Sequence, residues 1–266
     1  MARSSTLIAL LLVGPPALAG AADPVHPAAH GRTGFRVRIE NVSTPETLRS
    51  ASGATAPAPH SPGLWVVHTG SGAVFTEGKP DRGLGLESQA EDGNPARLAS
   101  SLAGASGAVA SGVFDTPVGE GRPGPALPGK AYEFAFEAGP GDRLTVTSMF
   151  GQSNDLFFAP SDAGLPLFER GAPLRGDITA RFLLWDAGTE VNEEPGFGPN
   201  QAPRQAAPGT GPSEQESVRR IADVQDGFTY PAVGQVIRVT ITPGAPLSGD
   251  RPAPRTVRND DNPYKD

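Results

Sequence analysis

The sequence contains no cysteine. A disulfide framework, a zinc site built from thiolates and a cysteine nucleophile are therefore all excluded. A domain without disulfides or a thiolate metal site must be stabilised by its own hydrophobic core or by a bound ion. This absence already narrows both the fold and the chemistry that the chain can carry.

Positive charge and long apolar segments are also scarce. The net charge is −7, which disfavours a nucleic-acid partner because phosphate binding needs a basic face. Beyond the N-terminus no run is long and apolar enough to predict a transmembrane span. Hydrophobic residues make up only 37% of the chain, whereas 34 Gly and 29 Pro are many, so long regular helices are not expected and short strands joined by turns are favoured.

The N-terminus has the pattern of a secretory signal peptide. Arg3 precedes an apolar run over residues 7–13, and residues 17–19 offer a small-x-small cleavage site. The run is too short to span a bilayer. We therefore predict a signal peptide over residues 1–21, a linker over residues 22–34, and a protein that is secreted or resides in the periplasm or cell envelope.

Alternating apolar and polar residues predict a series of strands, and one segment predicts a helix. The helix covers residues 94–104, where Asn94 can cap the first turn and Gly104 can end the last. Residues 193–213 are rich in Pro, Gly, Gln and Asn and predict a long irregular loop, and residues 244–266 predict a disordered tail. The predicted strands cover residues 35–40, 64–68, 132–137, 144–150, 178–185 and 236–241. Residues 35–243 should therefore form an all-β, antiparallel β-sandwich with one short helix and long irregular loops.

Enzyme signatures are weak. Residues 119–124 match the glycine pattern of dinucleotide-binding loops, but Pro123 and Pro125 prevent the helix that such a loop must open. Residues 151–154 lack the second Gly of a nucleophile elbow, and no His pair has metalloprotease spacing. We therefore expect a protein that is not an enzyme.

Acidic residues follow or precede three predicted strands. Asp186 and Glu190 flank a turn at Gly188, Asp155 ends another strand, and Asp226 opens the last part of the domain. Calcium binds six to eight hard oxygens and tolerates irregular loops, so Asp155, Asp186, Glu190 and Asp226 predict a calcium site if these loops meet. The alternative is that Asp and Gly are common in ordinary turns.

The same segments resemble the spondin N-terminal domain. Residues 153–158, residues 185–190 and residues 227–230 follow, in order, the family's S-P-D-W-F, Y/W-D-A-G-T-D and G-F-T-Y segments. The run Trp-Asp-Ala-Gly-Thr-Glu at residues 185–190 is the specific part. The resemblance covers roughly residues 34–243, and this sequence looks like a bacterial, stand-alone version.

The resemblance implies a fold related to C2 domains, with calcium bound by loops at one end. Asp155 and Asp186 match acidic residues of the family's motifs, and Glu190 stands where the family has Asp, which lengthens that arm by one methylene. Asp226 has the weaker claim, because residues 191–225 are an insertion. The animal members of the family are extracellular matrix and adhesion proteins.

Together these observations predict an exported calcium-binding module for adhesion or ligand binding. Its partner would be an extracellular or envelope protein or a glycan. A secreted hydrolase that uses the acidic residues, or a structural envelope protein without a small ligand, are the alternatives. Two ordered carboxylates across an open groove would favour the hydrolase. A closed oxygen cage would favour the binding module.

Overall fold

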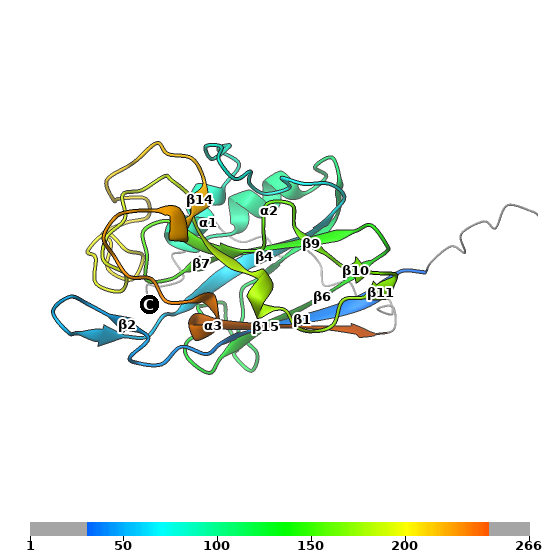
Figure 1. The fold of residues 1–266 in the computed structure, drawn as a ribbon, viewed down its shortest axis with the longest axis horizontal. Helices are drawn as coiled ribbons and strands as arrows, with labels where there is room; N and C mark the ends of the chain where they lie inside the picture. Colours follow the sequence, from blue (N-terminus) through cyan, green and yellow to red (C-terminus); the bar gives the residue numbers. More distant parts are fainter. Residues whose placement is uncertain (1–30, 245–266) are drawn as a thin grey trace, which may run out of the picture. The chain divides into compact units, whose positions relative to one another are not determined.

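The computed structural model describes residues 31–244 of the chain. The predicted signal peptide, residues 22–30 of the predicted linker and residues 245–266 of the predicted tail lie outside the described residues. The described part is an antiparallel β-sandwich, as the sequence predicts (Figure 1). Its first strand begins at Thr33, inside the predicted linker.

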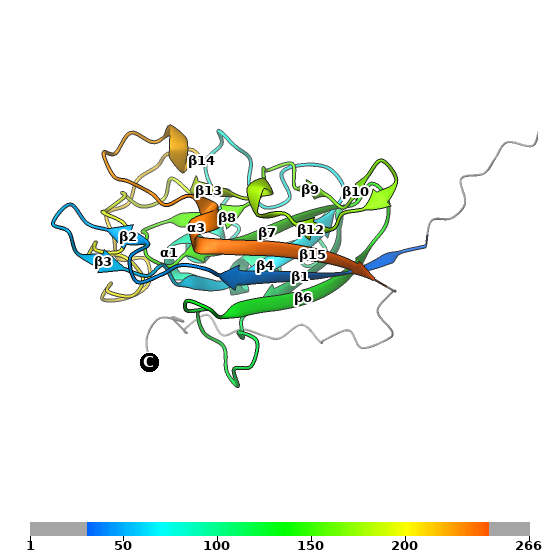
Figure 2. The same cartoon turned by 60° about the horizontal axis from the view of Figure 1, so that its bottom comes forward.

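The smaller sheet has four strands in the order β12-β15-β1-β6. In β1, Phe35, Val37 and Ile39 are buried while Arg36 is exposed, so the period of two predicts its buried face correctly. Figure 2 shows β15, β1 and β6 side by side, with β4 and β7 in the layer behind them. The bounds are Thr33–Asn41 for β1, Ala131–Ala138 for β6, Gly176–Asp177 for β12 and Ile237–Gly244 for β15.

The larger sheet has the order β14-β13-β8-β7-β4-β5, with β9 paired to β7. Seven of the eight residues of β7 are buried, because this sheet is covered on both faces. The bounds are His60–His68 for β4, Ala108–Phe114 for β5, Arg143–Phe150 for β7, Leu156–Ala159 for β8, Leu165–Pro166 for β9, Leu183–Asp186 for β13 and Arg219–Arg220 for β14. The sequence does not predict β5, which is rich in Ala, Ser and Gly.

Two helices pack on the outer face of the larger sheet. The predicted helix is α2, Ala96–Leu102, and a second helix, α1, Leu86–Asp92, precedes it. Leu86 and Leu98 join Trp185 in the apolar layer beneath the helices. The sequence does not predict α1, because glycines flank it and no side chain caps it. A Cβ at Gly85 would lie 2.5 Å from the backbone nitrogen of Leu98, so this glycine allows the two helices to approach.

Short elements complete the described part. A hairpin joins β2, Leu48–Arg49, to β3, Thr55–Ala56, and another joins β10, Phe168–Glu169, to β11, Ala172–Pro173. The predicted strand over residues 178–185 is in fact the 3₁₀ turn η1, Thr179–Arg181, followed by β13. The remaining elements are the 3₁₀ turn η2, Ile221–Asp223, and the helix α3, Val233–Val236.

The main core lies between the two sheets and is aromatic. Phe35, Tyr132, Phe150 and Phe158 are buried there. His60 is fully buried among these rings, and desolvation lowers its pKa to about 3, so it is a neutral core residue rather than a base. The Ser153 hydroxyl, within residues 151–154, donates to the Phe150 carbonyl.

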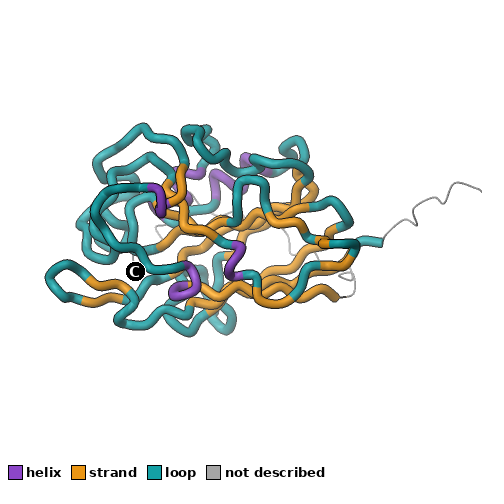
Figure 3. The backbone as a smooth tube through the Cα atoms, in the orientation of Figure 1, coloured by secondary structure: helices purple, strands orange, loops and turns teal. Residues whose placement is uncertain are grey.

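Loops gather at the end of the sandwich where β13 ends and β8 begins (Figure 3). Residues 193–213 contain no helix or strand, as the sequence predicts, but they are packed against the domain. Gln201, Ala202 and Gln205 are buried, and the Gln205 amide donates to Asp92 at the end of α1. This loop therefore covers part of that end of the sandwich.

Candidate metal centre

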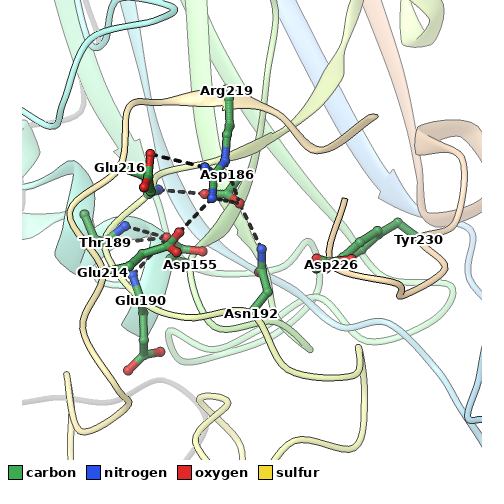
Figure 4. Close-up of polar contacts among 11 residues, drawn as sticks. Asp155, Asp186, Thr189, Glu190, Asn192, Glu214, Glu216, Arg219, Asp226 and Tyr230 are labelled. Carbon is green, nitrogen blue, oxygen red and sulfur yellow. Dashed lines mark hydrogen bonds and ion pairs between the residues drawn. The ribbon is translucent and has the colours of Figure 1, made fainter. Parts of the chain in front are cut away.

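Three carboxylates converge at the end of the sandwich where β13 ends and β8 begins, which we call the acidic end (Figure 4). One oxygen each from Asp155, Asp186 and Glu214 lie within 4.8 Å of one another. Asp155 directly precedes β8, Asp186 is the last residue of β13, and Glu214 lies five residues before β14. Because β8, β13 and β14 are neighbours in one sheet, their pairing brings these distant segments together. We call these three residues the acidic cluster.

Asp155 is fully buried, and its two carboxylate oxygens have different surroundings. Oδ2 accepts hydrogen bonds from the backbone nitrogens of Thr189 and Glu190, at 2.8 and 3.1 Å, and one from the Thr189 hydroxyl. Oδ1 is buried and has no hydrogen-bond partner. A buried acceptor without a donor costs about 1–3 kcal/mol, so a proton or a cation beside Oδ1 would stabilise this arrangement.

Asp186 is also fully buried, and each of its oxygens has a partner. Oδ1 accepts the backbone nitrogen of Gly188 at 2.7 Å, which closes the turn after β13. Gly188 has a φ of +71°, and a Cβ there would lie 2.7 Å from the Glu216 backbone, so only glycine fits this turn. Oδ2 accepts from the Asn192 amide at 2.9 Å and from Arg219.

Arg219 is the positive group of the cluster. Its Nη2 lies 3.3 Å from Asp186 Oδ2 and 2.9 Å from Glu214 Oε1, and its Nη1 lies 3.6 Å from Glu216 Oε2. Arg219 lies opposite Asp186 in the β13–β14 pair, so the strand register fixes the position of the Arg219 backbone, from which the side chain extends. Within residues 31–244 no other Lys or Arg forms an ion pair with these carboxylates. One positive charge therefore faces three clustered negative charges.

The carboxylates of the cluster resist ionisation. Burial and then the charge of Asp186 raise the pKa of Asp155 well above its usual range, although hydrogen bonds from Thr189 and Glu190 oppose that shift. Burial raises the pKa of Asp186 as well, against the effect of Arg219. Burial and the charge of Asp186 likewise raise the pKa of Glu214. In this arrangement at least one carboxyl must hold a proton or face a second cation.

Two of the four predicted ligands do not join the acidic cluster. The backbone nitrogen of Glu190 points at Asp155, but its side chain leaves in the other direction and accepts from the Asn154 amide at 3.3 Å (Figure 4). The Asp226 carboxylate accepts from the Phe228 backbone nitrogen and from the Tyr230 hydroxyl. Sequence reasoning missed Glu214, because it lies at the end of an irregular loop with no motif around it.

A second set of buried carboxylates lies nearby and consists of Glu91, Asp92 and Glu190, which we call the amide-bound group. Asp92 Oδ1 accepts from the Gln205 amide at 2.8 Å and from the Gly209 backbone nitrogen. Burial raises the pKa of Glu91 to about 8. No Lys or Arg of the described chain pairs with this group, so amides and retained protons compensate its burial.

An apolar groove of about 430 Å³ lies between β13 and the segment that leads into α3. Leu183, Ile221, Phe228, Tyr230 and Val233 line much of it. None of the three carboxylates of the acidic cluster is among the lining residues. The acidic cluster therefore lies outside this groove.

Comparison with known proteins leaves the family open. No protein-family model matches the chain, and no curated protein sequence matches it. Across residues 31–244, every helix is too short or too polar to cross a membrane. The arrangement of the acidic cluster is therefore the main basis for a functional hypothesis.

Proposed function

We propose that the acidic cluster binds one calcium ion, and that the protein is an exported, calcium-braced β-sandwich that binds a partner outside the cell. The observation that carries the proposal is Oδ1 of Asp155, a fully buried carboxylate oxygen without a donor beside two further carboxylates. Clustered hard oxygens are the ligands that calcium prefers. Asp155, Asp186 and Glu214 would hold the ion, and the remaining ligands would be carbonyls or water.

Calcium fits this donor set better than zinc does. The described cluster contains no histidine, and the protein contains no cysteine, so the nitrogen and sulfur ligands of a structural zinc site are missing. The ion would neutralise carboxylates that otherwise repel one another, and it would connect the loop before β8 with those around β13 and β14. This role is structural: it would rigidify one end of the sandwich.

Burial of the carboxylates argues against the hydrolase alternative. A glycosidase needs two carboxyl groups that reach a substrate from opposite sides of a cleft. Asp155 and Asp186 are fully buried, and neither lines the apolar groove. A binding role at the cell surface or in the medium also agrees with the secretory N-terminus and with the resemblance to the spondin N-terminal domain.

Thermal unfolding and calorimetric titration test the calcium site. At a hundredfold excess over its dissociation constant, an ion that binds only the folded state adds about 2.7 kcal/mol to the free energy of unfolding. We expect a clear difference between melts in calcium and in chelator. Asp186→Asn should remove most of that difference. Magnesium should replace calcium poorly, because it demands a tighter octahedral shell.

Glu133→Gln is a matched control, since it removes a carboxylate that pairs with Arg38 on the smaller sheet. It should leave the response to calcium intact. If the unaltered protein melts equally in calcium and chelator and titrates with no heat, the cluster shares a proton instead and the calcium proposal is wrong.

Export and partner binding need separate experiments. Intact mass of the secreted protein should correspond to a chain that begins near Gly20 or Ala22, and retention of Met1 would contradict export. A pull-down from the native envelope, with and without chelator, should recover a partner in a calcium-dependent manner if the end of the sandwich that holds the acidic cluster forms the binding surface.

A further inference from the structure

Arg219 occupies the position in the acidic cluster that an added cation would compete for. Its Nη2 contacts Asp186 Oδ2 and Glu214 Oε1, which belong to two of the three carboxylates that would hold calcium (Figure 4). A carboxylate oxygen that is a close ligand of a divalent ion is a poor acceptor for a guanidinium on the same side, because the two positive charges repel. The arginine and the ion cannot both keep their best positions.

The structure also contains an alternative position for the guanidinium. Nη1 of Arg219 already lies 3.6 Å from Glu216 Oε2, and the Glu216 side chain is 59% exposed. The Arg219 side chain is itself 30% exposed, so it can turn outward without crossing the core. Arginine is long and flexible, whereas its backbone is fixed in β14 beside Asp186.

We propose that Arg219 is an internal competitor of the calcium ion, which holds the acidic cluster together when no ion is bound and moves onto Glu216 when calcium enters. This inference rests on the proposed calcium site and adds its regulation. A resident guanidinium lowers the affinity for calcium, so the site responds to the higher calcium concentrations typical of extracellular modules. It also keeps the cluster from opening when calcium is low.

Calcium titrations of the full mature chain and its variants test the competition. Arg219→Gln removes the competing charge and keeps hydrogen-bonding capacity, so the calcium dissociation constant should fall at least about tenfold, as expected for removal of a charge beside a partly buried ion. Arg219→Lys keeps the charge but loses the planar fork, so the dissociation constant should stay close to that of the unaltered protein. If Arg219→Gln does not fold, an Arg219→Lys protein with much tighter binding would count against charge competition.

Glu216→Gln tests the second position of the guanidinium. It should weaken calcium binding by roughly two- to fivefold, because the displaced arginine loses its surface partner. Arg238→Gln is the matched control for Arg219→Gln, since Arg238 is an exposed arginine that lies 3.9 Å from Glu40 on the smaller sheet. It should leave the dissociation constant unchanged. The Nε–Hε signal of Arg219 in NMR spectra should shift on calcium addition.

The outcomes separate this inference from the proposed function. Equal or weaker calcium binding by Arg219→Gln overturns the competition and leaves the calcium site standing. Binding by Arg219→Gln but not by the unaltered protein supports the competition and overturns calcium as the resident ion. Binding by neither protein overturns both.

Discussion

Two sets of carboxylates with buried members lie at one end of this sandwich, and the burial of these members is compensated in different ways. In the acidic cluster, Asp155 has an oxygen without a donor, and one guanidinium faces three carboxylates. In the amide-bound group, Asp92 and Glu190 accept hydrogen bonds from neutral amides. The first arrangement leaves one buried carboxylate oxygen without a donor, whereas two of the three carboxylates of the second accept from neutral amides. Proximity of acids alone therefore does not distinguish the two sets.

The pH dependence of stability in chelator should be the largest effect. Glu91 has a folded pKa of about 8, against about 4.3 unfolded, so between these values the folded state retains a proton that the unfolded state has lost. The free energy of unfolding should therefore decrease as pH rises from about 4 to 8, by at most about 1.4 kcal/mol per pH unit for each such group. The raised pKa of Asp155 acts in the same direction.

Calcium should remove the part of this pH dependence that comes from the acidic cluster and leave the part that comes from the amide-bound group. With calcium saturating, the contribution of Asp155 disappears because the bound ion keeps it ionised, and the contribution of Glu91 remains. Glu91→Gln should remove that remainder. Chemical denaturation at several pH values in calcium and in chelator measures both slopes. Identical slopes under the two conditions would contradict the distinction between the sets.

Loss of an amide donor should destabilise the amide-bound group without affecting calcium. Gln205→Leu leaves Asp92 with only the Gly209 nitrogen, and we expect a loss of about 1–3 kcal/mol in the free energy of unfolding. The calcium dissociation constant should not change. Gln215→Leu, at an exposed position of the segment before β14, is the control and should change stability by less than about 0.5 kcal/mol. A loss of calcium binding in Gln205→Leu would mean that the two sets act as one.

Asp155→Asn should have the opposite sign in chelator. The new amide can keep the hydrogen bonds from Thr189 and donate toward the neighbouring carboxylates, so stability should rise by about 1–2 kcal/mol while the response to calcium is lost. Asp177→Asn, an exposed acid of β12, should show neither effect. Destabilisation of Asp155→Asn in chelator would show that its charge is already compensated without an ion.

The smallest effects should come from the two acids that the structure leaves outside the acidic cluster. Glu190→Gln and Asp226→Asn should each change the calcium dissociation constant by less than about threefold, since neither carboxylate lies with the other three and only their longer-range charge is lost. Calorimetric titration of the two variants measures this. A loss of binding in either one would return that residue to the ligand set.

Strands with alternating apolar and polar residues could be predicted from sequence, because one face of each is buried and its apolar residues recur at every second position. β1 and β6 follow this pattern, with their apolar residues on the shared core. The helix α1 and the strand β5 could not be, because glycines flank the first and small residues dilute the second. Whether these two segments form a helix and a strand depends on their contacts with α2 and β4, which no local sequence pattern contains.

For the acidic cluster, Asp155 and Asp186 are the two of the four ligands predicted from sequence that the structure brings together. The sequence placed Asp155 at the end of the strand that starts at Leu144, whereas it lies directly before β8, a strand that the sequence did not predict. Tertiary structure decided the rest. Whether the side chain of Glu190 turns toward Asp155 depends on which backbone nitrogens that carboxylate binds. Glu214 and Arg219 enter the cluster only because β14 pairs with β13 after an irregular loop. Such a loop can end in many places, and only the complete sheet selects one of them.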